Sequence, residues 1–274
     1  MELYGEPVPL TLPRHAVSPR QVARAAEIWR LCQVAAVEAS TRRGWGPRRM
    51  LDARAAFIVA NQCVVHLREA SYGERLWART WVRDFRRNMI TRREVRVMGE
   101  DGPVALATQQ WVYVDASQKP ARAPQSLVDD FPIFETTTAP QRVPPVSRAA
   151  GPEAAGAESV EVLDIWQTWM DPIGHLNHPF YVDLCEEAVA RQVASGGLVP
   201  EAIQPVAEQV RFRRPVMRGD RVHVRTRLLG RTDDGAAVLR HVLDDGQGTV
   251  YAEAHTVRRM ADGGDLAALW VPSS

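Results

Sequence analysis

The sequence predicts an α+β fold that occurs twice in one chain of 274 residues. A stretch near the middle, residues 120–159, holds seven prolines and an Ala-Gly-rich run, which favour neither a helix interior nor a central strand. Sequence on one side of this stretch is repeated on the other side. In each half a helical pattern is followed by alternating strands. We therefore expect an N-terminal half at residues 1–119, a linker at 120–159 and a C-terminal half at 160–274.

The repeat is a match in residue type and order. The segment 72–81 (YGERLWARTW) has the same pattern as 218–227 (RGDRVHVRTR), with Gly219 lying 146 positions after Gly73. Two matches at nearly one displacement, the second between the regions near residues 101 and 248, indicate a duplicated domain. The alternative is that glycine–acid turns before strands are simply common.

Each half begins with a predicted helix. In the first half Pro19–Ser40 has one broad apolar face, and Ser18 supplies an N-cap before the proline. In the second half Tyr181–Ala194 follows Pro179 and ends at two glycines. Each helix is expected to lie across the concave face of its own, mostly antiparallel sheet. The expected strands are Phe57–Arg68, Arg75–Arg83, Arg92–Met98, Val104–Val114, Glu208–Arg213, Arg221–Leu229, Ala237–Leu243 and Thr249–Arg258.

Charge and cysteine content narrow the class of protein. The chain has 34 Lys+Arg against 33 Asp+Glu, which argues against binding driven by the phosphates of nucleic acid. Cys32, Cys63 and Cys185 show no pairing or metal-ligand spacing and indicate free thiols in a reducing compartment. No signal peptide is visible, and the longest apolar run, Ala55–Val65, is too short to cross a bilayer. We expect a cytoplasmic protein with no membrane partner.

Polar functional groups concentrate in residues 169–181 (WMDPIGHLNHPFY), which lead into the second helix. Asp171 lies four residues before His175 and could orient its imidazole, or act as base or nucleophile. Glu186 and Glu187 lie within the helix, where at least one could face the partner half. The structural alternative is that these carboxylates only cap the loop or face solvent, and that the asparagine at 177 caps the helix.

The spacing Asp-x-x-Gly-His-Leu-Asn-x-x-x-Tyr at 171–181, followed by Glu-Glu-Ala, resembles the signature of hotdog-fold thioesterases. From about Pro9 to Met260 the chain resembles the acyl-ACP thioesterases, which carry two hotdog halves. In the first half, strands around Trp81, Arg93 and Trp111 are similar to strands of that family. The resemblance implies a tandem (double) hotdog fold, each half a long helix wrapped by an antiparallel sheet. It also implies hydrolysis of an acyl thioester between the halves.

The resemblance also assigns site residues. It places the helix carboxylate at Glu187, as in acyl-ACP thioesterases, or at Glu186, as in single-domain relatives, and we prefer Glu187. The implied catalytic residues are Asp171, His175, Asn177, Glu187 and Glu186, and the substrate-binding candidates in the motif are Gly174 and Tyr181.

The chain departs from the plant members of the family at two positions, since Ile173 stands where they have an asparagine and Val216 where they have a cysteine. It also has His178 in place of the second asparagine of the hotdog signature. A Cys-His-Asn mechanism is therefore not supported, and Cys185 reads as a small apolar helix residue. A carboxylate mechanism remains. In it, backbone N–H groups near Gly174 to Leu176 or at the helix start polarise the thioester carbonyl. A carboxylate either activates water or attacks the carbonyl carbon directly. The motif histidine orients that water or protonates the departing thiolate.

No cofactor or metal is expected. The sequence has no glycine-rich phosphate loop, and its strand histidines lack ligand spacing. Those histidines, which we interpret as structural, are His66, His223, His241 and His255.

The first half lacks the motif, because its equivalent loop at 12–19 has no Asp, Gly-His pair or Asn. We expect one competent pocket, with the first half supplying tunnel walls. Asn61 and Gln62 interrupt an apolar run and are candidate substrate-binding residues across the interface; a bulge or edge position is the alternative.

The expected partner is an acyl carrier protein or a coenzyme A thioester, and a homodimer is left open. Arginine pairs could steer an acidic carrier protein, although solvated faces are the simpler explanation. A hotdog dehydratase and a non-hydrolytic acyl-binding or chain-release protein are alternative functions. The arginine pairs are Arg42-Arg43, Arg48-Arg49, Arg86-Arg87 and Arg213-Arg214.

Overall fold

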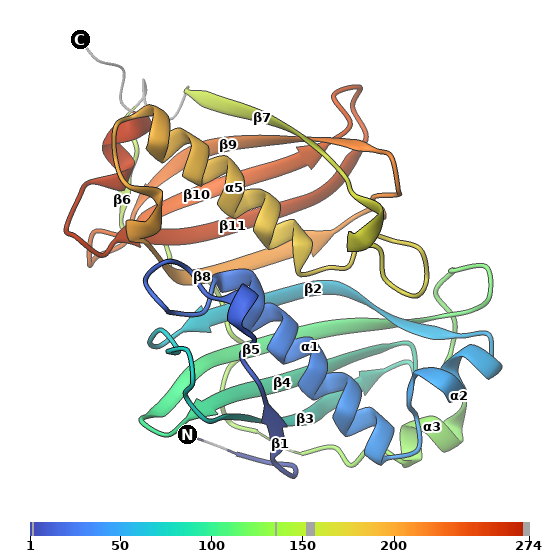
Figure 1. The fold of residues 1–274 in the computed structure, drawn as a ribbon. Helices are drawn as coiled ribbons and strands as arrows, with labels where there is room; N and C mark the ends of the chain where they lie inside the picture. The colour runs from blue at the N-terminus through green and yellow to red at the C-terminus, as the bar shows by residue number, and fades with distance from the viewer. Residues whose placement is uncertain (2, 135, 152–156, 271–274) are drawn as a thin grey trace. The chain divides into compact units, whose positions relative to one another are not determined.

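The computed structural model describes residues 1, 3–134, 136–151 and 157–270 (Figure 1). Contacts between Cα atoms divide the chain into two compact units. The first unit comprises Met1–Val17 and Gln21–Gln141, and the second comprises Ser18–Arg20 and Arg142–Ser274.

The first unit is one antiparallel sheet with a long helix, α1 (Ala25–Arg42), across one face (Figure 1). The strands follow the order β1-β3-β4-β5-β2, so the N-terminal strand forms the edge beside β3. The apolar face of α1 packs on this sheet through residues such as Trp29, which is fully buried. The other elements are β1 (Val8–Leu10), η1 (Arg14–Ala16), α2 (Pro47–Asp52), β2 (Ala56–His66), β3 (Leu76–Arg86), β4 (Ile90–Gly99), β5 (Gly102–Val114) and α3 (Gln125–Asp129).

The second unit repeats this arrangement around α5 (Phe180–Ser195) (Figure 1). Its strands follow the order β7-β9-β10-β11-β8, and the short β6 also pairs with β9. Val189 and Val193 of α5 pack against Leu228 and Leu239 of the sheet and against Trp270. The other elements are β6 (Arg148–Ala149), β7 (Glu158–Asp164), η2 (Gln167–Trp169), η3 (Pro200–Ala202), β8 (Ile203–Phe212), β9 (Arg221–Arg231), β10 (Ala237–Asp244), β11 (Val250–Met260) and η4 (Leu266–Trp270).

The strand register repeats between the units as well. Thr80 of β3 lies opposite Val95 of β4. At a displacement of 146 residues, Thr226 of β9 lies opposite His241 of β10. The predicted α+β class, with a long helix wrapped by an antiparallel sheet in each half, is confirmed.

The predicted start of the first helix is wrong. The helix begins at Ala25, with Arg24 as its N-cap, and not at Pro19. The preceding residues pair elsewhere, since the N–H of Ala23 donates to the carbonyl of Ala70 at 2.8 Å and Val22 bridges Ser71. This pairing outweighs the local capping signal.

The predicted linker region is partly packed. Its segment 123–131 contains α3, and Leu127 and Phe131 are buried in a cluster with Trp45 and Tyr113 of the first unit. These apolar side chains pack residues 123–131 of the predicted linker against the first unit, although the linker is rich in proline. Residues 152–156, the Ala-Gly-rich part of the predicted linker, lie outside the described residues.

Among the helices in the described part of the chain, none combines the length and the hydropathy needed to span a membrane.

Candidate active site

The predicted motif forms a tight loop before α5. The N–H of Asp171 donates to the carbonyl of His175 at 2.7 Å, and the N–H of Gly174 donates back to the carbonyl of Asp171 at 3.0 Å. Gly174 has a φ of +82°, a conformation that glycine adopts without steric cost. The loop therefore brings the carboxylate and the imidazole of the motif to one end of the helix.

The Asp171 carboxylate uses only one of its oxygens to hold this loop. Its Oδ1 accepts hydrogen bonds from the backbone N–H groups of Ile173 at 2.9 Å and His175 at 3.1 Å. In the described part of the chain, no donor binds its second oxygen, Oδ2. Because Asp171 and His175 are both only half-buried, Oδ2 is accessible to water or a substrate.

The backbone N–H groups of Gly174 to Leu176, which we expected, as an alternative to those at the helix start, to polarise a carbonyl, donate within the protein in this structure. The first two N–H groups donate to Asp171, and the N–H of Leu176 donates to the carbonyl of Val216 at 2.9 Å. All three donors thus already have acceptors, two within the loop and one at Val216. Gly174 still borders open space, since nothing lies within 4 Å of where its Cβ would stand.

Tyr181 is connected to the motif loop through Val216. Its side chain is 2 % exposed, and its hydroxyl oxygen accepts a hydrogen bond from the N–H of Val216 at 3.1 Å. Burial raises the pKa of Tyr181, so the phenol stays neutral. Val216 thereby connects Tyr181 to Leu176 through both of its backbone groups, a role for which its side chain gives no sequence signal.

The two helix glutamates differ in their surroundings. Glu187 is exposed and pairs with Arg191 one turn further on, at 2.7 Å. Arg191 also reaches Glu161 of β7 at 3.3 Å. Glu186 is half-buried, between buried Cys185 and the exposed glutamate. Burial therefore favours Glu186 over Glu187 as a carboxylate near the motif.

The alternative role of Asn177 as helix N-cap is not observed. The N-cap is Pro179, and no side chain caps it. The backbone of Asn177 instead shapes the loop, because its N–H donates to Trp169 at 3.0 Å and its carbonyl accepts from Phe180 at 2.9 Å.

An aromatic stack lies beside the loop and was not predicted. The Trp166 and Trp169 rings stack at 5.3 Å between centroids, and Trp169 stacks on Phe180 at 5.2 Å. Trp166 is 63 % exposed, so the stack offers apolar surface next to the motif. The Trp-x-x-Trp spacing at 166–169 is the sequence signal of this stack.

Two further titratable groups of this unit, Cys185 and His241, are buried. Cys185 is buried, and burial raises the pKa of its thiol, which supports its interpretation as an apolar helix residue. His241 is buried between the hydroxyls of Thr226 at 2.9 Å and Thr256 at 2.8 Å. In the described residues no cluster of three or more His, Cys, Asp or Glu side chains could hold a metal ion.

Comparison with known proteins identifies the fold. Residues 165–270 match the family model of the Thioesterase-like superfamily. The structure is similar to that of a Lactobacillus plantarum protein described as an oleoyl thioesterase, with a TM-score of 0.76 and 15% identity, covering 99% of this chain and 98% of that chain. The chain therefore has a double hotdog fold.

Two further double-hotdog structures are similar. The 12:0-ACP thioesterase of Umbellularia californica has a TM-score of 0.74 and 16% identity, covering 93% of this chain and 94% of that chain. An acyl-ACP thioesterase of Bacteroides thetaiotaomicron has a TM-score of 0.70 and 14% identity, with 93% and 97% coverage. No protein with curated annotation matches the chain in sequence. The predicted tandem hotdog fold is confirmed, and it is similar to the fold of these acyl-ACP thioesterases.

In this double hotdog, Asn61 and Gln62 lie on β2 of the first unit, and the motif lies in the second. The strand register shifts between Val59 and Asn61, so a bulge is present where the polar residues interrupt the apolar run. Gln62 is fully buried, accepting a hydrogen bond from Gln109 at 3.1 Å. Gln109 in turn accepts one from Trp111 at 3.1 Å. The structure thus shows the bulge that was the alternative to a substrate-binding role for Asn61 and Gln62.

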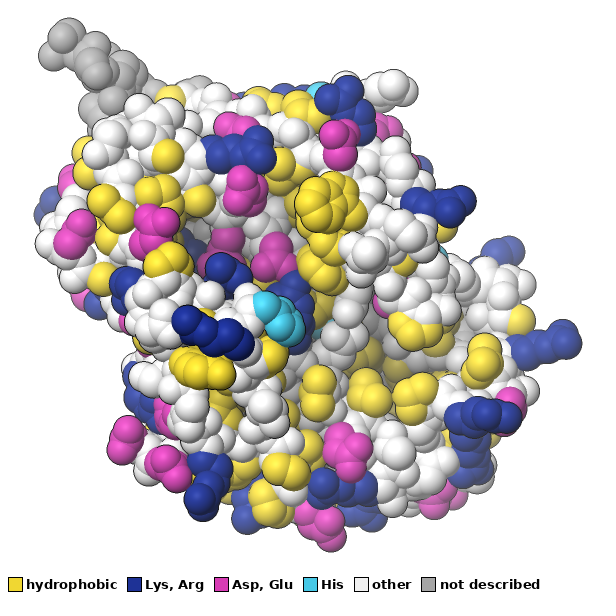
Figure 2. All heavy atoms as spheres, in the orientation of Figure 1, with side chains coloured by type: hydrophobic (Ala, Val, Ile, Leu, Met, Phe, Trp, Pro, Cys, Tyr) yellow, Lys and Arg dark blue, Asp and Glu magenta, His cyan; other side chains and the backbone are white. Residues whose placement is uncertain are grey.

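Several arginines of the predicted carrier patches have local partners. Arg213 pairs with Glu253 at 3.1 Å, and Arg42 with Glu38 at 3.0 Å. Arg49 lies over the ring of Trp45 at 3.5 Å. On the face drawn in Figure 2, arginines are scattered among acidic side chains, as expected for a solvated surface.

Proposed function

We propose that this protein hydrolyses an acyl thioester to a free acid and a thiol. The observation that carries the proposal is that the two oxygens of Asp171 have different surroundings. Oδ1 accepts the hydrogen bonds that hold the motif loop, whereas Oδ2 accepts none from the described residues and can act as a base. The match of residues 165–270 to the Thioesterase-like superfamily supports it. The comparisons do not favour the alternative of a dehydratase.

In the proposed reaction, Oδ2 of Asp171 takes a proton from water as its oxygen bonds to the thioester carbonyl carbon. The tetrahedral intermediate then collapses, and the C–S bond breaks. His175 gives a proton to the departing thiolate and regains one from the carboxyl group of Asp171. The products are a carboxylic acid and a thiol, and no group outside the chain and water is required.

The developing oxyanion needs donors other than the loop backbone, because the N–H groups of Gly174 to Leu176 are already used. We assign this role to the side-chain amide of Asn177 together with the His175 ring. For the helix carboxylate we propose Glu186, on the ground of its partial burial.

We propose an acyl carrier protein as the carrier, with coenzyme A as the alternative. Two of the similar structures are described as ACP thioesterases, which supports this choice. The three cysteines, all within the described residues, are buried and form no disulfide, which fits action in the reducing cytoplasm.

The test is release of free thiol from acyl-carrier and acyl-CoA thioesters by the purified protein. Wild-type protein should release thiol, and Asp171→Asn should not. Glu187→Gln serves as a matched control, because it changes an exposed carboxylate of the same unit. Water loss from a 3-hydroxyacyl thioester without thiol release would overturn the proposal, as would binding without turnover.

A further inference from the structure

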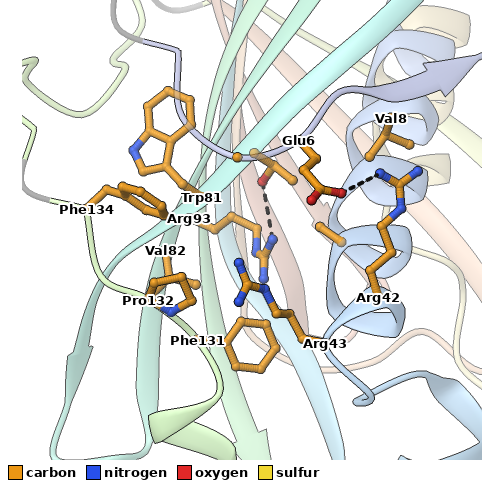
Figure 3. Close-up of a pocket in the computed structure, with 13 residues that line it drawn as sticks. Glu6, Val8, Arg42, Arg43, Trp81, Val82, Arg93, Phe131, Pro132 and Phe134 are labelled. Atoms are coloured by element: carbon orange, nitrogen blue, oxygen red, sulfur yellow. Dashed lines mark hydrogen bonds and ion pairs between the residues drawn. The ribbon is translucent and has the colours of Figure 1, made fainter.

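The first unit contains a second feature that the proposed hydrolysis does not use. A cavity of about 290 Å³ lies between the C-terminal end of α1, strand β3, and the segments around residues 5–8 and 131–134 (Figure 3). This volume is near the lower end of the range for small-molecule sites, about 300–1,000 Å³. All the residues that line it belong to the first unit.

A buried arginine points into this cavity. The side chain of Arg93 on β4 is 6 % exposed, and its hydrogen bonds go to two hydroxyls, Thr80 Oγ1 and Ser40 Oγ, each at 3.3 Å. A guanidinium has five N–H donors, and these two bonds are long. No carboxylate among the described residues pairs with it. A buried cation without a counter-charge is costly, so its presence requires an explanation.

The alternation of β4 explains why the neighbouring acid does not serve as this partner. Glu94 points to the opposite face of the sheet, where it pairs with Arg96 at 2.9 Å and Arg83 at 3.0 Å. Desolvation alone lowers the pKa of Arg93 to about 10, with no carboxylate acting against it. Among the residues that the structure describes, no carboxylate therefore neutralises the charge of Arg93.

Further positive charge borders the same cavity. Arg42 and Arg43 both line it, and Figure 3 shows Arg43 pointing into it toward Arg93, above the ring of Phe131. The acidic residue of the lining, Glu6, lies 3.7 Å from Arg42 and has a side chain that is 84% exposed. Arg42 also pairs with Glu38 at 3.0 Å, so the positive charge without a carboxylate partner among the described residues of this cavity comes from Arg93 and Arg43.

The rest of the lining is apolar, which suits an organic anion better than a free inorganic one. Trp81 and Phe134 border the cavity together with Phe131 at its arginine end. One wall is fixed by the N-terminal segment, because a Cβ on Gly5 would lie 2.5 Å from the carbonyl oxygen of Thr80. A preformed cavity in which apolar walls meet a few convergent charges is typical of a ligand site.

We propose that this cavity binds a small organic monocarboxylate, with the carboxylate on Arg93 and Arg43 and the hydrocarbon against the aromatic side chains. The fork of a guanidinium matches a carboxylate in a bidentate manner. The site is separate from the Asp171 motif, and the proposal does not depend on thioester hydrolysis.

The experiment is calorimetric titration of the whole protein with octanoate, with octanol and inorganic phosphate as matched probes. Octanoate should bind more tightly than either probe, because octanol lacks the negative charge and phosphate lacks the hydrocarbon chain. Arg93→Met should weaken octanoate binding by at least about tenfold, the loss expected for charge-assisted hydrogen bonds. Arg75→Met is the control, because Arg75 is 83% exposed beside Glu100 in the same unit; it should bind as wild type does.

Thermal unfolding separates a ligand role from a structural one. Without ligand, Arg93→Met should be at least as stable as wild type, because the substitution removes an uncompensated buried charge. Octanoate should raise the Tm of wild type and not that of the variant. Arg43→Met, at an exposed position, should weaken binding without loss of stability. The proposal is overturned if wild type does not bind octanoate, or if phosphate or octanol binds as tightly as octanoate. It is also overturned if Arg93→Met binds octanoate normally. Loss of stability in Arg93→Met together with normal octanoate binding by Arg43→Met would overturn it as well.

Discussion

The hydroxyl oxygen of Tyr181 accepts a hydrogen bond from the backbone N–H of Val216 at 3.1 Å. The carbonyl of Val216 in turn accepts from the N–H of Leu176 at 2.9 Å. The first turn of α5 is thereby connected to the motif loop through a residue that follows β8. This connection fixes the position of the motif loop relative to Tyr181.

Tyr181→Phe tests this connection. The substitution keeps the ring that contacts Phe212 at 5.0 Å but leaves the buried N–H of Val216 without an acceptor. We expect a loss of about 1–3 kcal/mol in the free energy of unfolding, measured by urea denaturation. Thiol release should fall through a lower kcat as the loop shifts. Unchanged stability would show that the bond contributes nothing.

Asp171→Asn tests the assignment of the base. The Asn oxygen can still accept the N–H groups of Ile173 and His175, so the loop should keep its shape. We expect kcat to fall at least about 100-fold, because the amide cannot take a proton from water. Stability should remain near that of wild type. Near-normal turnover in a folded variant would refute the assignment.

A pair of substitutions distinguishes the roles of the two helix glutamates. Glu186→Gln should lower kcat at least about tenfold if the half-buried carboxylate lies near the reacting groups. Glu187→Gln should leave kcat almost unchanged, since it only breaks an exposed ion pair with Arg191. The reverse result would restore the assignment of Glu187 that the resemblance suggested.

Cys185→Ala tests the exclusion of a thiol nucleophile. The Cys185 side chain is 1% exposed and burial raises the pKa of its thiol, so no thiolate forms near neutral pH. We expect wild-type kcat in the thiol-release assay. An inactive variant with a normal circular dichroism spectrum would contradict this.

His241 should make stability depend on pH. Burial lowers the pKa of His241 to about 3, against its usual value of 6.5. Below pH 6.5 the unfolded chain binds a proton that the folded chain does not, so stability is lost as pH falls from there toward 3. Between pH 7.5 and 5.5 this one group should cost about 1 kcal/mol. Urea denaturation of wild type and His241→Gln at both values checks it: the variant should show a smaller drop.

Much of the fold could be predicted from local patterns. The alternation of β3 and β9 and the two-glycine end of α5 are properties of single segments, and the structure shows them. The start of α1 could not be predicted, because Ala23 pairs with Ala70, which lies far along the sequence.

The candidate site was predictable in its residue types but not in its contacts. The spacing from Asp171 to Tyr181 identified the loop. It did not show that the loop N–H groups bind Asp171 and Val216, since those bonds depend on backbone geometry and a distant strand. Arg93 was noted only as part of a strand, because its lack of a carboxylate partner is visible only in three dimensions.

Strand β1 occupies the edge of the first sheet beside β3, and the residues just before it form a wall of the arginine-lined cavity. This position has a practical consequence for any altered form of the protein. Removal of residues 1–10 would expose the edge of β3, whose unpaired backbone groups could then pair with other molecules and promote aggregation. A fusion partner attached ahead of Gly5 would sit at the cavity mouth. Engineered versions of this chain are therefore better extended elsewhere.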